Sequence, residues 1–149
     1  MLGRFVLVGM TIALVGTTQV AVAGPYLSAW KLKRHCEETP ARVVQCGFQF
    51  AKGNRNWAAT KQTTVQHGSS SSLQFSYTRQ VGDDNTAFTQ QNGKNQSSTT
   101  IQVGDGNFAG THQVGRNQSS TTVQLGDGHW AATSSVGSGT ETNVVTTSW

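Results

Sequence analysis

The chain has 149 residues, of which 35% are hydrophobic and 12% are charged. This composition indicates one small domain without a large apolar core, and it disfavours a typical enzyme domain. The formal net charge is +4 and is concentrated in residues 24–66, which hold seven basic and two acidic side chains. We interpret this stretch as a charged, solvated leader rather than as a nucleic-acid-binding surface.

The first 23 residues have the features of a secretory signal. Arg4 precedes an apolar run over residues 5–15, and Ala21, Val22 and Ala23 form an A-x-A cleavage site. A membrane anchor needs about 20 apolar residues, and Thr17 interrupts the run too early. The sequence therefore predicts a signal peptide over residues 1–23, removed after Ala23, and hence an exported protein.

An N-terminal segment over residues 24–52 is expected to be short and irregular. It contains the only two cysteines, Cys36 and Cys46, which in an exported chain are candidates for a disulfide bond. Such a bond would close a loop of about ten residues and contribute about 2–3 kcal/mol on the chain-entropy model. His35 is adjacent, but two cysteines and one histidine are too few ligands for a closed zinc site.

An internal repeat begins after this segment. Gln-x-Gly recurs every 11 residues from Gln80 to Gln124, and Ser135 continues the series. Asn/Gln-x-Ala/Ser-x-Thr-x-Gln recurs in the same phase, alternating between an Asn-Ala and a Gln-Ser form, so the unit is 22 residues with two similar halves. The upstream copies at Asn56 and Gln74 are further apart, which indicates an insertion of about seven residues around Ser69 to Ser72. The repeat supplies these turn glycines: Gly82, Gly93, Gly104, Gly115, Gly126 and Gly137.

The selected residues of each half lie two apart, which is the period of a β-strand. Each half therefore predicts one strand of about six residues and a tight turn, in which Gly, Asp and Asn supply positive φ angles. A two-strand unit cannot bury a face alone, so the units are expected to stack. We predict an all-β solenoid over residues 53–146, with about four two-strand rungs (53–80, 82–102, 104–124 and 126–146) and a tail over residues 147–149.

Stacking would place equivalent amide side chains above one another, about 4.8 Å apart. Glutamine would then bond to glutamine and asparagine to asparagine up the stack, and a buried amide needs such a partner. The expected ladder residues are Asn56, Gln62, Gln74, Gln80, Asn85, Gln91, Gln96, Gln102, Asn107, Gln113, Gln118 and Gln124. Because identical rungs end in unpaired strand edges, we expect the protein to polymerise end on end.

The repeat resembles the curlin-repeat family, the subunits of bacterial curli amyloid fibres. The family motif is Gln-x-Gly-x-x-Asn-x-Ala-x-x-x-Gln, and it is matched fully from Gln80 to Gln91 and from Gln102 to Gln113. A third copy is partial, because His129 replaces Asn and Ser135 replaces Gln. Gly53, Asn56, Ala58 and Gln62 give a further match, although the family's leading Ser is absent throughout.

This resemblance implies export through a dedicated outer-membrane pore, co-assembly with other curli subunits, and extracellular fibres for adhesion and biofilm matrix. We predict a fibre subunit with no enzymatic activity, no cofactor or metal, no requirement for nucleic acid and no small-molecule substrate. Two alternatives are a secreted β-solenoid adhesin that does not polymerise and an ice-binding module with a flat Thr face. The Thr pairs Thr99/Thr100 and Thr121/Thr122 recur only at every second strand.

Four aromatic residues fall outside the inward-facing pattern. Trp57, Phe88, Phe108 and Trp130 have outward parity, so they are candidates for contacts between fibres or with surfaces, or for ordinary exposure. His129 replaces a ladder asparagine, and we interpret it as structural rather than metal-binding.

Overall fold

A computed structural model describes residues 18–19, 34, 43–64 and 71–148 of the chain. Among these residues the strands are β1 (Thr18–Gln19), β2 (Val43–Lys52), β3 (Trp57–Thr63), β4 (Ser72–Val81), β5 (Thr86–Val103), β6 (Phe108–Leu125), β7 (Trp130–Ser138) and β8 (Glu141–Thr147). The rest of the predicted signal peptide, Cys36 and Trp149 lie outside the described residues.

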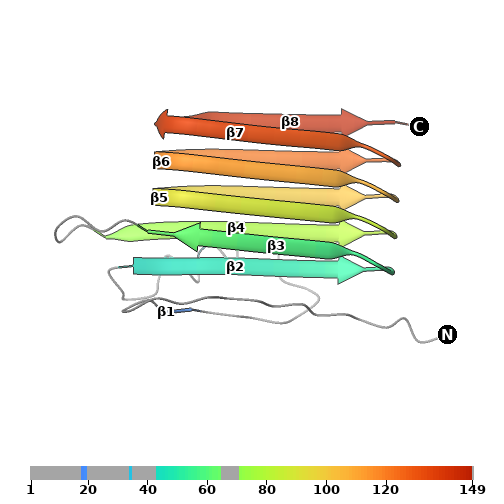
Figure 1. Ribbon diagram of the computed structural model, residues 1–149, viewed down its shortest axis with the longest axis horizontal. Coiled ribbons are helices and arrows are strands. Elements are labelled where there is room, and N and C mark those ends of the chain that lie inside the picture. Colours follow the sequence, from blue (N-terminus) through green and yellow to red (C-terminus); the bar gives the residue numbers. More distant parts are fainter. Residues whose placement is uncertain (1–17, 20–33, 35–42, 65–70, 149) are drawn as a thin grey trace.

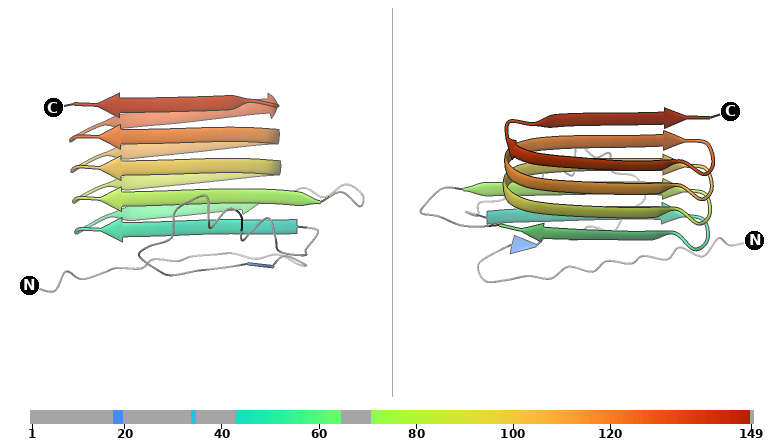
Figure 2. Two further views of the ribbon diagram at one scale, coloured as in Figure 1. Left: turned by 180° about the vertical axis from the view of Figure 1, so that it is seen from behind. Right: turned by 45° about the horizontal axis from the view of Figure 1, so that its top comes forward.

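The described strands form a β-solenoid, as the sequence predicts. Figure 1 shows them stacked in two layers, and all the pairings between them are parallel. The first layer contains β2, β4, residues 96–103 of β5, residues 118–125 of β6, and β8. The second layer contains β3, residues 86–93 of β5, residues 108–115 of β6, and β7. The turns that join the layers are seen at the two edges of the stack in Figure 2.

The register keeps each repeat position in one vertical column. Gln74 pairs with Gln96 and Gln96 pairs with Gln118, so equivalent residues are 22 apart in the sequence. Between the two lowest rungs the offset is larger, because Gln45 pairs with Gln74 and Gln62 pairs with Gln91. This offset of 29 residues contains the seven-residue insertion that the sequence predicts, and the stack accommodates it without a shift of register.

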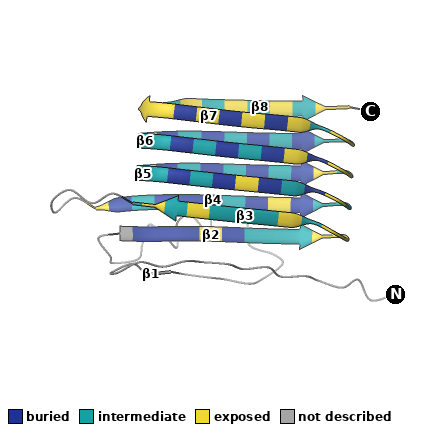
Figure 3. Cartoon of the chain, in the orientation of Figure 1, coloured by how far each residue is buried: buried dark blue, intermediate teal, exposed yellow. Residues whose placement is uncertain are grey.

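The space between the layers is filled by small and amide side chains. Burial alternates along β5 and β6, as Figure 3 shows, and the inward residues include Ala87, Ala109, Ser98 and Thr100, all of them nearly inaccessible to solvent. Contacts such as Ser120 Oγ to Thr133 Oγ1, 3.1 Å, join the two layers directly. The core is therefore polar in composition but closely packed, in agreement with the low apolar content of the chain.

The solenoid begins earlier than the sequence analysis placed it. β2 lies within residues 24–52, which we expected to be irregular, yet it pairs with β4 over its whole length. Its outward residues Cys46 and Phe48 are buried, and they form an apolar cluster with Val44 and Phe75. The motif search missed this strand because Gly47, Gln49 and Ala51 replace the Ser, Thr and Gln of the repeat at the paired positions.

Glycine at the turns is required by the close approach of successive rungs. Gly104 has φ +118°, and a Cβ atom placed on it would overlap the carbonyl oxygen of Gly126 in the rung above. Gly106 belongs to the same turn but has open space around its Cβ position. Arg55 and Asp84 occupy the equivalent place in lower rungs, so this second position accepts a side chain.

Substitution of these two glycines separates the cost of steric overlap with the next rung from the cost of a positive φ angle. We expect Gly104→Ala to lower the free energy of unfolding by more than about 2 kcal/mol, since it adds steric overlap to a disfavoured φ. Gly106→Ala should lower the free energy of unfolding by about 1 kcal/mol, the usual cost of a left-handed conformation for a residue other than glycine. Chemical denaturation of both variants measures the two losses in free energy of unfolding. Equal losses would show that overlap with the next rung does not add to the cost of a Cβ atom at Gly104.

Candidate functional site

Three columns of glutamine run up the inside of the solenoid. In the first, Gln45 Nε2 donates to Gln74 Oε1 at 3.0 Å, and the column continues through Gln96 to Gln118. The other two columns consist of Gln62, Gln91 and Gln113 and of Gln80, Gln102 and Gln124, with amide-to-amide distances of 2.9–3.0 Å. Every donor points toward the next rung up the chain, so each column has one direction.

The second amide hydrogen of these side chains bonds to a main-chain carbonyl, in most cases across the core. Gln102 Nε2 donates to Thr86 O at 2.9 Å, and Gln91 Nε2 donates to Phe75 O at 3.0 Å. Gln102 lies in the first layer and Thr86 in the second, so these bonds fasten the two layers together. The buried amides thereby satisfy both donors, which offsets the cost of removing them from water.

The asparagine column works differently from the predicted ladder. Asn85 Nδ2 donates to Gly104 O at 2.7 Å, and Asn85 Oδ1 accepts the main-chain N–H of Asn107 at 3.1 Å. Asn107 repeats both bonds to Gly126 O and the N–H of His129. The expectation that these asparagines bond amide to amide is therefore wrong, because each of them lies beside a turn and its amide meets main-chain groups of the next rung.

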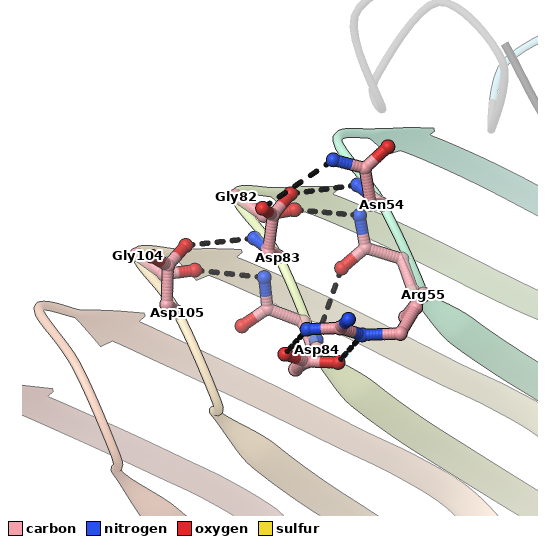
Figure 4. A network of polar contacts seen from close by, with 9 residues as sticks. Asn54, Arg55, Gly82, Asp83, Asp84, Gly104 and Asp105 are labelled. Atoms are coloured by element: carbon pink, nitrogen blue, oxygen red, sulfur yellow. Dashed lines mark hydrogen bonds and ion pairs between the residues drawn. The ribbon is translucent and has the colours of Figure 1, made fainter. Parts of the chain in front are cut away.

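Aspartates form a further column on the outer edge of the first set of turns. Asp83 Oδ1 accepts the main-chain N–H of Asn54 at 2.7 Å, and Asp105 and Asp127 each accept the N–H of the rung below in the same way. Figure 4 shows the bonds that Asp83 and Asp105 accept, and beside them the ion pair between Arg55 and Asp84. The turn aspartates thus bind successive rungs together, a role that the sequence analysis did not assign to them.

The opposite edge carries basic and amide side chains. Lys94 and Arg116 occupy equivalent positions there, and Asn95 Nδ2 donates to Asn117 Oδ1 at 3.2 Å. Asn95 and Asn117 have positive φ angles of 53°, which asparagine tolerates better than most residues. The two edges of the solenoid therefore differ in charge.

The columns weaken at both ends of the stack. Gln80 Oε1 lacks a hydrogen-bond partner in the described part of the chain, because Ala51 lies in the rung below it. At the other end Ser135 and Thr146 replace glutamine, and their buried hydroxyls also lack partners among the described residues. His129 replaces asparagine, and its Nε2 lies 3.0 Å from Leu125 O, consistent with the structural role predicted for it.

The outward aromatic residues are exposed, as their parity predicts. Trp57, Phe88, Phe108 and Trp130 keep 50%, 37%, 36% and 69% of their surface accessible. Phe108 and Trp130 are stacked on successive strands with ring centroids 6.0 Å apart. These rings lie on the outer face of the second layer, and the hydrogen-bonded core does not use them.

The predicted disulfide can be followed at one of its two cysteines. Cys46 is disulfide-bonded and fully buried, and Cys36, the other cysteine of the chain, lies outside the described residues. Within the described ranges no group of three or more His, Cys, Asp or Glu side chains is placed to hold a metal ion. None of the described residues belongs to a helix long and apolar enough to cross a membrane.

Comparisons with known proteins give no relative for this arrangement. No family model, no curated protein and no solved structure matches the chain.

Substitution of one ladder glutamine tests the buried hydrogen bonds. We expect Gln102→Ala to lower the free energy of unfolding by about 3 kcal/mol, because it removes three hydrogen bonds and leaves Gln124 Oε1 and one Gln80 donor without their partners. Gln90→Ala is the matched control, since Gln90 lies on the outer face of the same solenoid. Denaturant unfolding curves measure both, and a similar loss in the control would contradict the ladder's role.

The Arg55–Asp84 pair predicts a pH dependence. The hydrogen bond and charge of Arg55 hold the pKa of Asp84 below its ordinary value, so the pair's stabilisation is present above the ordinary aspartate pKa of about 3.9. It is lost as the pH falls through the lowered pKa of the folded state. Between about pH 5 and pH 2 the melting temperature of the unmodified protein should therefore fall slightly further than that of Asp84→Asn. If the melting temperatures of the two proteins fall in parallel with pH, the ion pair makes no pH-dependent contribution to stability.

Proposed function

We propose that the protein is a structural subunit of extracellular, curli-like amyloid fibres that serve adhesion and biofilm matrix. The observation that carries the proposal is the continuous stacking of identical polar columns up to an upper edge where, among the described residues, no further strand is paired. β7 and β8 form one edge, and in each of them the outer row of backbone groups has no strand beyond it among the described residues. Such an edge is a template for another chain.

The polar core supports assembly in preference to catalysis. The inward positions are occupied mostly by Gln, Asn, Ser, Thr and Ala, and the donors of the glutamine amides are used inside the stack. Parallel, in-register strands with amide ladders are the arrangement found in cross-β fibres. Export as a separate soluble subunit, through the outer-membrane pore that the curlin resemblance implies, would deliver this edge to the cell surface.

The alternative of an ice-binding face has weaker support. Thr99 and Thr121 share one outward column, but Phe48, Tyr77 and Asn143 occupy its other positions. The flat threonine array therefore extends over two rungs only. A solenoid adhesin that stays monomeric is the remaining alternative, and fibre formation distinguishes it from the proposal.

The proposal predicts that the secreted protein forms thioflavin-positive fibres with reflections at about 4.8 Å and about 10 Å in X-ray diffraction. The double variant Gln102→Ala, Asn107→Ala should lengthen the lag time several-fold, because both substitutions weaken the stacked columns. The double variant Gln90→Ala, Asn92→Ala changes the same residue types on the outer face and should assemble as the unmodified protein does. A chain that stays monomeric and dye-negative for days at high concentration would contradict the proposal.

A further inference from the structure

The two layers of the solenoid contain different numbers of strand segments. Among the described residues, and leaving aside β1 in the predicted signal peptide, the pairings place five segments in the first layer, from β2 to β8, and four in the second, from β3 to β7. The stack therefore begins and ends in the first layer and consists of four and a half rungs. A second copy added by translation alone would place its β2 above β8, and the strand position above β7 would stay empty.

A half-turn about the stack axis removes this gap. We propose that successive copies in the fibre are related by a half-turn, so that β2 of the next copy adds to β7 and β3 of the next copy adds to β8. This inference rests on the proposed function and specifies its junction. The rotated strands run in the same direction as the strands that they meet, because the two layers of one solenoid run in opposite directions.

The sequence repeat supplies the register of this junction. Because the Gln-x-Gly motif recurs every 11 residues, each half-repeat is equivalent to the next one in the opposite layer. The half-turn then places Gly47 of the next copy over Ala131, and Ala58 of the next copy over Thr142. These are inward positions with small side chains, so the core continues through the junction at the same width.

The polar groups at the end of the stack support the same register. Thr146 Oγ1 is buried and has no hydrogen-bond partner among the described residues. The half-turn places Gln62 of the next copy above it. Gln62 Nε2 already donates to Gln91 and to Cys46 O, while its Oε1 faces the open edge, as the direction of the column requires. Thr146 would therefore donate to Gln62 and continue the column.

The outer faces are also compatible. Trp130, 69% exposed, would lie over Cys46 of the next copy, beside the apolar cluster that contains Phe48. The half-turn also brings the turn edge that bears Asp83, Asp105 and Asp127 above the edge that bears Lys94 and Arg116. Acidic and basic turn edges then alternate along each side of the fibre, so like charges do not accumulate on one side.

The edge of β2 must be open for this junction. In the full chain β1 pairs with it, Thr18 opposite Val44 and Gln19 opposite Gln45. Both β1 residues belong to the signal peptide that the sequence predicts to be removed after Ala23. The junction therefore belongs to the secreted protein, and the experiment uses protein recovered after secretion.

Cysteine cross-linking distinguishes the half-turn from translation. In the half-turn Val145 lies next to Lys61 of the neighbouring copy, and in translation it lies next to Phe50, which shares its column. All three residues have outward parity, and adjacent parallel strands are about 4.8 Å apart, within the Cα range of a disulfide. We would mix Val145→Cys protein with either Lys61→Cys or Phe50→Cys protein, assemble fibres, oxidise them mildly and run non-reducing gels.

The half-turn predicts at least a ten-fold excess of covalent dimer in the Lys61→Cys mixture over the Phe50→Cys mixture, and no dimer from any single variant. Dimer mainly with Phe50→Cys, or fibres with no cross-link in either mixture, would overturn the half-turn and leave the proposed function intact. Failure of the unmodified protein to form fibres would overturn both.

Electron cryomicroscopy gives an independent readout on the unmodified fibre. At about 4.8 Å per rung, the half-turn predicts a subunit rise of about 22 Å and an axial repeat of about 43 Å. Translation with an empty strand position predicts a single repeat of about 24 Å, and that repeat would overturn the inference.

Discussion

The structure depends on one constraint, that an amide side chain removed from water must have partners for its donors and its acceptor. The described core contains only one small apolar cluster, on the outer side of β2 and β4, and elsewhere its larger buried side chains are mostly Gln and Asn. A glutamine in the middle of a column satisfies this constraint by bonding up, down and across the core. Every rung is therefore needed by its neighbours, and a single rung has no stable core of its own.

The same constraint fixes the register. A strand displaced by one residue would turn its glutamines to solvent and bring outward residues such as Lys61 or Gln90 into the core. The loop between β3 and β4 shows how strongly the columns dominate, since it takes up seven additional residues while Gln62 and Gln91 remain paired. The entropic cost of closing a loop rises only slowly with its length. Loss of one amide partner, by contrast, leaves a buried polar group unsatisfied.

Much of this arrangement could be predicted from the sequence because the repeat is periodic at two levels. The spacing of two residues identified the strands, and the spacing of 11 identified the turns and the glutamine columns. What escaped prediction lacks a repeat signal. β2 carries Gly47 and Ala51 at repeat positions, and its outward residues are buried, so neither motif nor parity indicated a strand. The backbone partners of Asn85 and Asn107 also escaped prediction, because recurrence alone does not distinguish a backbone partner from an amide partner.

The ends of the stack differ from its middle in a way that affects assembly. Ala51, Ser135, His129 and Thr146 stand where an interior rung has glutamine or asparagine, so a junction between copies has fewer side-chain hydrogen bonds than a junction between rungs. Main-chain pairing along two strands remains available there, and it does not depend on side-chain identity. A subunit built in this way holds its own rungs together more firmly than it holds its neighbour. Under the proposed function, such an order of strengths would let the chain fold as a unit first and add to a fibre afterwards.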